Sequence, residues 1–534
     1  VLEYSYILLS YHFQTGALMI RCFIILLVFP SLVSAIEIDV LLTNGTIYDG
    51  KSLNSRIGDI AINNGKIIDL TQNKEVTAKL VVDCTGKIIC PGFIDLHNHS
   101  DNQVVAASTR ANINYLLQGC TTIVTGNCGA GPVYVDKYYT AINQAGSGTN
   151  VIHLLAQGNL RREIMGDERR KATPEEQAAM LKLADKAMDD GAWGMSTGLI
   201  YVPSSYADTA EITAIASVVA KYGGIYVSHI RGEGSGLITS VNEAMQIGRD
   251  AKLPVHISHF KSSGRNNWGL VRVAAKTIQD ARDDGQQVTA DQYPYRASST
   301  SLSATTIPTW ARAGGRPAMI KRFDDSQEGP RIRTAIQAKL DRTDNGASIR
   351  IARCYQQKWV GKSIAQIAKL EKKPALEIVE VIERNGGASV VSFSMDPEDI
   401  RFVMSLPWVA TASDGRAYLP GADKPHPRSY GTFPRKISLF AQQEKIISVG
   451  HAIRSATGLP AEILGLKDRG TLKPSMIADI VVYDPTTLQD KATFDDPHQY
   501  CEGIEYVFIS GKLAVYRGRP TGALHGQALK KPAR

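Results

Sequence analysis

The stretch PGFIDLHNHS at residues 91–100 gives the strongest indication of the fold. It is an apolar run that ends in two histidines, His97 and His99. Residues two apart in an extended strand point to the same side, so both imidazoles can reach one metal ion. A lone His-x-His pair is weak evidence, and it becomes strong only when other strands end in residues of the same kind.

Four later apolar runs also end in a residue that can bind a metal ion: Cys128, His229, His259 and Asp414. Taken singly, Cys128 is explained as a structural cysteine and Asp414 as a helix cap. The series of two histidines, then Cys, His, His and Asp, is instead typical of a zinc centre. His256 lies three residues before His259, so strand parity predicts that it faces outward as a structural residue.

The spacing of these runs predicts the fold class. Helical segments such as residues 174–190 alternate with short buried runs at 225–227, 255–257 and 288–290. Alternating β and α units predict an α/β fold, a (β/α)₈ TIM-like barrel, with its chemistry at the carboxyl ends of the strands. We expect this barrel to span residues 91–465.

The two ends of the chain have a different pattern. Short alternating runs separated by turn signals at residues 36–90 and 466–534 predict strands that together build one small β-sandwich. A charged, helix-prone stretch at about 308–387 interrupts the barrel rhythm and is interpreted as an insertion. It either covers the mouth of the site or is a surface excursion.

The first 35 residues predict an export signal. After an upstream extension, Met19 and Arg21 precede an apolar run at 22–30 and a small-x-small ending at Ala35. This pattern is typical of a secretory signal peptide, and the apolar run is too short to span a bilayer. We therefore expect a periplasmic or secreted protein with no stable membrane insertion after cleavage. A buried N-terminal helix is the alternative.

The amino-acid composition limits the classes of binding partner that we expect. The 534 residues carry a formal net charge of +8, with 43% hydrophobic and 21% charged residues, and basic and acidic side chains are interspersed. These values are those of a globular protein, and we expect no nucleic-acid partner. Six cysteines would remain after signal cleavage, too few for a dense disulfide framework, although Cys84 and Cys90 are a geometric possibility.

The expected zinc ion suits hydrolysis. Zinc lowers the pKa of a bound water from about 15.7 towards 7 and polarises a carbonyl oxygen. A carboxylate beside that water, such as Asp414, can take its proton and deliver it to the departing nitrogen. The set therefore favours a metal-dependent hydrolase of amides.

Eight motifs, distributed over most of the chain, resemble the N-acyl-D-amino-acid deacylases (D-aminoacylases) of the metal-dependent amidohydrolase superfamily. The resemblance covers residues 36–515. The motifs are PGFIDLHNHSD at 91–101, GNCG at 126–129, STGLIYVP at 196–203, SHIRGEG at 228–234, ISHFK at 257–261, DQYPY at 291–295, SDG at 413–415 and HPRSYGTF at 426–433.

The resemblance implies unequal metal positions. A tight zinc would be held by Cys128, His229 and His259, a weaker position would lie at His97 and His99, and Asp414 would be the catalytic base. Many other amidohydrolases bridge two metals with a carboxylated lysine. The cysteine in that place argues against a hydantoinase or a dihydroorotase.

The resemblance also implies a substrate site for an N-acyl-D-amino acid. Lys261, Tyr293 and Arg428 would engage its carboxylate, Tyr201 would lie near the reacting carbonyl, and Met395 near the side-chain pocket. Arg296 is a further candidate. Met395 favours neutral side chains. A related enzyme acting on D-peptides or cyclic amides, and a secreted binding protein without activity, are the alternatives.

Overall fold

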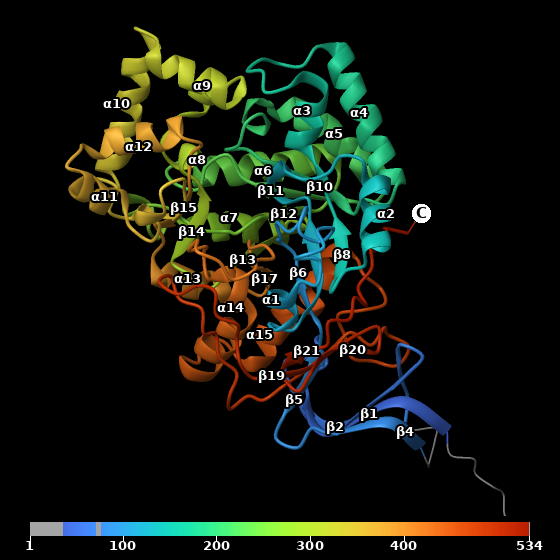
Figure 1. Ribbon diagram of the computed structural model, residues 1–534. Coiled ribbons are helices and arrows are strands. Elements are labelled where there is room, and N and C mark those ends of the chain that lie inside the picture. Colours follow the sequence, from blue (N-terminus) through green and yellow to red (C-terminus); the bar gives the residue numbers. More distant parts are fainter. Residues whose placement is uncertain (1–35, 71–75, 533–534) are drawn as a thin grey trace, which may run out of the picture.

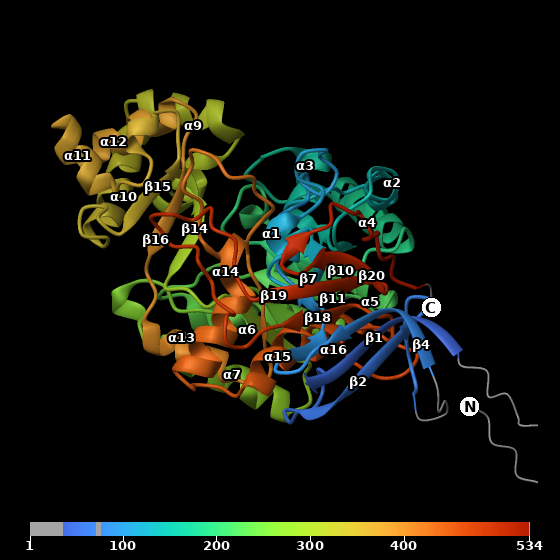
Figure 2. The same ribbon diagram turned by 60° about the horizontal axis from the view of Figure 1, so that its bottom comes forward.

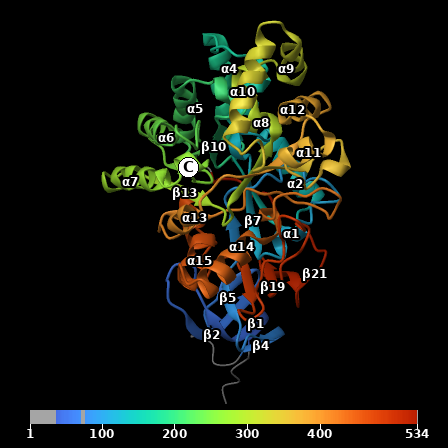
Figure 3. The same cartoon turned by 90° about the vertical axis from the view of Figure 1, so that its left-hand side faces the viewer.

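The computed structural model describes residues 36–70 and 76–532. The predicted signal peptide and upstream extension, residues 1–35, lie outside these ranges. The described residues form three parts: a β-sheet built from both chain ends, a central barrel and an insertion. The barrel lies between the other two parts (Figure 1). In the side view the insertion lies at one end and the sheet at the other, with the barrel between them (Figure 3).

The predicted barrel of parallel strands is confirmed. The strands are β6 (Phe93–Asp95), β7 (Cys120–Thr125), β8 (Asn150–His153), β9 (Leu155–Ala156), β10 (Gly194–Gly198), β11 (Ile225–His229), β12 (Val255–Ile257), β13 (Val288–Gln292) and β17 (Val409–Thr411). β9 continues β8 after one residue, so the strands occupy eight positions in the order of the chain. A parallel bridge between Asn98 and Gly415 joins the last position to the first.

Helices follow most barrel strands and cover the outer face. They are α1 (Ile113–Leu116), α2 (Val135–Ala145), α3 (Gln157–Met165), α4 (Pro174–Asp189), α5 (Thr209–Lys221), α6 (Leu237–Ala251), α7 (Leu270–Asp283), α13 (Pro397–Met404), α14 (Arg428–Arg435), α15 (Val449–Ala456) and α16 (Gly458–Leu464). α4 begins with a capping box, in which Thr173 accepts from the Glu176 amide and Glu176 accepts from the Thr173 amide. Such caps fix where a helix starts relative to the preceding strand.

Successive side chains of a barrel strand point alternately outward and inward, so they belong to two different hydrophobic cores. Tyr226 points outward into the core beneath the helices, whereas Ile225 and Val227 point into the barrel with Ile94 and Ala410. The inner residues fill the barrel, so the catalytic machinery is restricted to its carboxyl end.

Both chain ends contribute to one nine-stranded sheet. Its strands are β1 (Ile36–Ile47), β2 (Arg56–Asn63), β3 (Lys66–Ile68), β4 (Val76–Asp83), β5 (Ile88–Pro91), β18 (Ile480–Tyr483), β19 (Ile504–Ile509), β20 (Lys512–Tyr516) and β21 (Arg519–Pro520). The N-terminal and C-terminal halves meet where β5 pairs antiparallel with β18. In Figure 2 the blue strands of the N-terminal part lie beside the red strands of the C-terminal part. One face encloses a small core that contains Leu42, Ile62 and Phe508.

The insertion is a compact unit with its own core. It comprises β14 (Ala297–Ser301), α8 (Leu302–Thr306), α9 (Gly315–Asp324), α10 (Glu328–Asp341), β15 (Ile349–Arg353), α11 (Ile364–Glu371), α12 (Ala375–Arg384) and β16 (Ser389–Phe393). β14 and β15 flank β16 in a three-stranded antiparallel sheet, so this unit begins before residue 308 and ends after residue 387. Ile336, Ile364 and Ile382 are among the side chains of its separate core.

No helix in residues 36–70 and 76–532 has both the length and the apolar character needed to cross a bilayer.

Candidate metal centre

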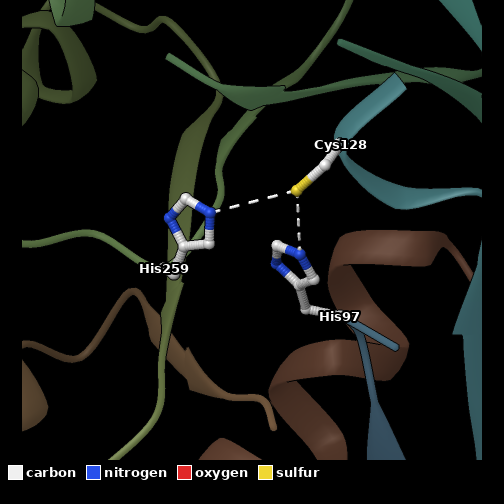
Figure 4. Close-up of side chains that lie close together, drawn as sticks. All are labelled: His97, Cys128 and His259. Atoms are coloured by element: carbon white, nitrogen blue, oxygen red, sulfur yellow. Dashed lines mark hydrogen bonds between the residues drawn. The ribbon is translucent and has the colours of Figure 1, made fainter. Parts of the chain in front are cut away.

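A thiol and two imidazoles meet at the carboxyl end of the barrel. The Cys128 Sγ lies 3.6 Å from the Nδ1 of His229 and 3.9 Å from the Nε2 of His259, and these two nitrogens are 2.7 Å apart. All three side chains are buried. Figure 4 shows the sulfur with the rings of His97 and His259 turned towards it.

This arrangement fits a zinc ion. Around a tetrahedral zinc with Zn–N bonds of about 2.0 Å and a Zn–S bond of about 2.3 Å, ligand atoms lie about 3.3–3.6 Å apart. The two sulfur–nitrogen distances lie at or slightly above this range, whereas the two nitrogens, at 2.7 Å, lie closer together than two zinc-bound nitrogens would. The other ring nitrogen of His229, Nε2, has no hydrogen-bond partner in the described part of the chain, so no hydrogen bond on that side fixes the ring. Thiolate and imidazole are the donors that zinc prefers, and the residues therefore suit this ion.

A second group of potential ligands shares the same cavity. The Oδ1 of Asp414 lies 3.1 Å from the Nε2 of His99 and 3.6 Å from the Nε2 of His97. The Nε2 of His97 is also 3.3 Å from the Cys128 Sγ. His97 therefore lies between the two groups, and all six residues predicted as metal ligands are brought together.

Three of these six residues have a left-handed backbone: Cys128 at φ 54°, His259 at φ 37° and Asp414 at φ 50°. Such angles are uncommon outside glycine and are tolerated where the surrounding structure fixes them. Before Cys128, Gly126 has φ 78°, and a Cβ there would lie 2.0 Å from the carbonyl oxygen of Leu154. The GNCG motif therefore needs its first glycine for a tight turn that carries the thiol into the site.

Asp291 connects three histidines beneath the centre. Its Oδ1 accepts a hydrogen bond from the His259 amide at 2.7 Å, and its Oδ2 lies 2.9 Å from the Nε2 of His256. The same Oδ2 is 3.5 Å from the Nδ1 of His97. The prediction that His256 faces outward is wrong. β12 ends at Ile257, and the left-handed turn at His259 breaks the parity on which that prediction depended.

A buried carboxylate joins the first barrel strand to the last. Asp95 accepts hydrogen bonds from the Ser413 amide at 2.8 Å, the Ser413 hydroxyl at 2.6 Å and the Asn98 side-chain amide at 2.8 Å. Burial raises the pKa of Asp95 to about 6, while these hydrogen bonds oppose the rise. Since His97 and Asp414 follow on these strands, Asp95 fixes their relative positions.

On the opposite edge of the His259 ring, Glu233 and Lys261 form an ion pair. The Glu233 Oε1 lies 2.5 Å from the Lys261 Nζ and 2.9 Å from the His259 Nδ1. Lys261 also donates to the His259 carbonyl oxygen at 3.0 Å. Because Cys128 and His229 face the Nε2 of the same ring, Glu233 contacts His259 from behind the metal position.

The positive charges in the centre favour the ionised forms of Cys128 and Asp414. Burial opposes ionisation of the Cys128 thiol, but the charge of His97 and hydrogen bonds from His229 and His259 outweigh it and hold the pKa well below its usual range. Burial likewise opposes ionisation of Asp414. Arg428, whose Nη1 lies 2.7 Å from the Asp414 Oδ2, and then His97 hold the pKa of Asp414 well below normal.

The centre opens into a cavity of about 430 Å³. His99, Cys128, Tyr201 and Asp414 line its floor, and residues of β14, β15 and β16 line one wall. The insertion therefore contributes directly to the cavity, which favours a covering role over a surface excursion. The Tyr201 ring packs edge-on against His229 at 5.1 Å, and its hydroxyl is 3.0 Å from the Thr300 Oγ1 of β14.

The residues expected to bind substrate are divided. Arg428 lines the cavity, with its guanidinium 4.7 Å from the centre of the Tyr293 ring. The Tyr293 hydroxyl is buried without a hydrogen-bond partner in the described residues. Lys261, described above, lies behind His259. Of the six residues, only Tyr201 and Arg428 line the cavity; Lys261, Tyr293, Met395 and Arg296 do not. Met395 is buried in the main core, and the exposed Arg296 packs over Phe393.

Sequence reasoning did not identify Asp95, Glu233 and Asp291 as parts of the site. Each lies inside a quoted motif: PGFIDLHNHSD, SHIRGEG and DQYPY. Their positions in those motifs were the available signal, since carboxylates that hold metal-bound histidines are a common companion of the ligands.

Comparison with known proteins identifies the family. Residues 80–515 match the model of the amidohydrolase family. The chain is 31% identical over 525 residues to the D-aminoacylase of Alcaligenes xylosoxydans xylosoxydans, covering 93% of this chain and 98% of that protein.

Two solved structures are also similar. A D-aminoacylase with a binuclear metal centre superposes with a TM-score of 0.78 at 30% identity, covering 92% of this chain and all of the other. The N-acyl-D-glutamate deacylase of Bordetella bronchiseptica, complexed with zinc and a phosphonate inhibitor, gives 0.78 at 29% identity with the same coverage. The chain therefore belongs to the amidohydrolase family, among the D-aminoacylase-like enzymes, and is a hydrolase of carbon–nitrogen bonds.

Proposed function

We propose that this protein hydrolyses the amide bond of N-acyl-D-amino acids and depends on zinc. Water adds to the acyl carbonyl carbon, the carbon–nitrogen bond breaks, and a carboxylate and a free D-amino acid leave. The observation that carries the proposal is the meeting of Cys128, His229 and His259 at one point, with Cys128 and Asp414 both lining the cavity.

The residues take separate roles in this proposal. Cys128, His229 and His259 hold the principal zinc, and His97 with His99 form a weaker second position. Zinc at the principal position would act as a Lewis acid towards the carbonyl oxygen and would lower the pKa of a bound water. Asp414 accepts the proton of the attacking water and passes it to the departing nitrogen.

The substrate carboxylate meets cationic and phenolic groups in this scheme. Arg428 lines the cavity and can form paired hydrogen bonds with a carboxylate. The unpartnered Tyr293 hydroxyl beneath it is a second donor. Tyr201 lies beside His229, where it can contact the acyl carbonyl. Lys261 pairs with Glu233 behind His259, and Met395 and Arg296 lie outside the cavity lining, so we assign none of the three a direct substrate contact.

A chiral substrate panel tests this function. N-acetyl-D and N-acetyl-L forms of the same amino acids are assayed beside small cyclic amides, with zinc measured on the same sample. We expect about one tight zinc per chain and hydrolysis of the D forms only. Turnover of cyclic amides alone would favour the alternative amidohydrolase reaction, and absence of both zinc and hydrolysis would favour a binding protein.

Export is part of the proposal. The small-x-small ending at Ala35 supports cleavage and a periplasmic or secreted mature protein. N-terminal sequencing of the protein from its natural host should begin at Ile36. A mature protein that retains residues 19–35 would overturn this assignment.

A further inference from the structure

The cavity above the metal centre carries more positive charge than one carboxylate requires. Four arginines line it, Arg162, Arg353, Arg416 and Arg428, against two carboxylates, Asp414 and Asp423. A cavity lined mainly by one sign of charge attracts ligands of the other sign. The number of these charges that remain free then decides which ligand fits.

Two of the arginines already have carboxylate partners. Arg428 pairs with Asp414, and the Nε of Arg162 donates to Asp167 at 2.9 Å. The other nitrogens of Arg162 donate to the carbonyl oxygen of Val202 and to the Asn159 side chain. All three nitrogens of Arg162 are therefore engaged, and Arg428 is the cation already assigned to the substrate α-carboxylate, so neither is counted as a partner for a second anion.

The remaining two arginines are free. Arg353 and Arg416 make no ion pair within residues 36–70 and 76–532, and Asp423 is engaged with His498 at 3.0 Å. Arg353 ends β15 of the insertion, whereas Arg416 follows β17 of the barrel, so the two charges come from different walls.

The neighbouring lining is polar. Ser299, Thr300 and Ser301 of β14 and Ser389 of β16 face the cavity beside Arg353. Within the described residues the lining includes no leucine, isoleucine, methionine or phenylalanine. The apolar part of the lining consists of smaller side chains and two tyrosine rings: Ala130, Val202, Ala352, Pro425, Tyr201 and Tyr418. Beside Arg353, a carboxylate would find hydroxyl and guanidinium donors.

We propose that the preferred substrates carry a second carboxylate, which Arg353 and Arg416 bind. This rests on the proposed deacylase function and specifies its substrate class. The second carboxylate is either that of an acidic D-amino acid or that of a dicarboxylic acyl group. Arg428 and Tyr293 take the α-carboxylate, so each anionic group of the substrate has its own cationic partner.

The test compares kcat/KM for matched substrates. N-acetyl-D-glutamate and N-acetyl-D-aspartate are assayed beside N-acetyl-D-leucine and N-acetyl-D-methionine, with N-succinyl-D-leucine placing the second carboxylate on the acyl side. We expect a dianionic substrate to exceed the neutral-side-chain N-acetyl compounds at least tenfold. Whether glutamate and aspartate or the succinyl compound leads identifies which part of the substrate carries the charge.

The variants Arg353→Gln and Arg416→Gln connect the preference to these residues. Each should lower kcat/KM for the preferred dianion by roughly ten- to a hundredfold, mainly through KM, since it removes one charge-assisted contact. Activity on N-acetyl-D-leucine should change less than threefold. Arg350→Gln is the matched control, because Arg350 lies on the same strand but pairs with Asp495 outside the cavity.

Two results would overturn the inference while leaving the deacylase function intact: preference for neutral N-acetyl-D-amino acids, or equal losses on neutral and dianionic substrates in both variants. Hydrolysis of no D-amide at all would instead refute the proposed function itself. Thermal unfolding of each variant checks that the fold is preserved.

Discussion

At the scale of single residues, Asp414 is the group with the most specific chemical assignment. Its two oxygens lie against His99 and Arg428. In Asp414→Asn the amide can still contact these neighbours but cannot accept a proton, so we expect kcat to fall by at least roughly a hundredfold. Zinc content should stay near the wild-type value, because the three principal ligands remain. Retained turnover would remove Asp414 from its role as the base.

Glu233 offers a test of how the ligands are held. An imidazole that donates its second nitrogen to a carboxylate is fixed in one tautomer and binds metal more strongly. For Glu233→Gln we expect zinc affinity, measured by competition with a chelating dye, to fall by roughly tenfold or more. Glu243→Gln is the control, since Glu243 pairs with Arg231 in the same segment. Equal affinity in both variants would contradict the assigned role of Glu233.

Lys436 gives a pH-dependent prediction for stability. It is 2% exposed, its Nζ has no hydrogen-bond partner in the described residues, and burial lowers its pKa from 10.5 to about 7. Below pH 7 the folded protein must bury a charge. Between pH 7 and 10.5 the folded state loses this proton while the unfolded state keeps it, so stability contributed by this residue rises with pH.

Lys436→Met should therefore stabilise the fold most below pH 7. The gain in the free energy of unfolding should be a few kcal/mol at most, since one pKa unit corresponds to about 1.4 kcal/mol. It should shrink as the pH rises towards 10. Denaturant unfolding of both proteins at pH 6, 8 and 9.5 measures this, and a gain that does not vary with pH would point to packing instead.

At the scale of elements, the C-terminal segment is a brace for the barrel. Gly526 donates to the carbonyl oxygen of Ser147, and Leu529 to that of Val151 near the start of β8. The carbonyl oxygen of Leu529 in turn accepts from the Trp193 indole at 2.6 Å. These contacts lie at the amino ends of the strands, away from the metal centre.

A chain that ends at Gly522 should be less stable but still active when folded. Apart from the Lys530 ion pair, residues 526–531 make seven hydrogen bonds with the barrel, and their loss predicts a decrease in the free energy of unfolding of roughly 4–10 kcal/mol. Lys530→Ala removes only an exposed ion pair with Asp136 and should have almost no effect. Thermal unfolding compares the three proteins. An unchanged midpoint in the shortened chain would show that the segment does not brace the barrel.

At the scale of the whole molecule, the centre draws its donors from five barrel strands distant in sequence. A metal that binds only this folded arrangement stabilises the entire barrel. Treatment with a chelator should lower the melting temperature and abolish activity, and added zinc should restore both. Cys128→Ser, which weakens the site, should lose most of the response to chelator. A melting temperature that stays constant after verified metal removal would contradict this coupling.

The sequence alone determined the barrel, the contribution of both chain ends to one sheet and the strand-end residues that meet at the site. These depend on periodicity and on short-range parity, which a local pattern carries. Parity failed at His256, because the left-handed turn at His259 is a property of the folded loop.

Only the tertiary structure decided which partners each side chain has. It placed Glu233 behind His259, Asp291 beneath three histidines, and strands of the insertion beside Arg353 in the cavity wall. It also left Lys261, Tyr293, Met395 and Arg296 outside the cavity lining. Such contacts join residues up to several hundred positions apart, and no local pattern records how distant segments pack. The types of metal ligand could therefore be predicted from the sequence, whereas the charge of the cavity could not.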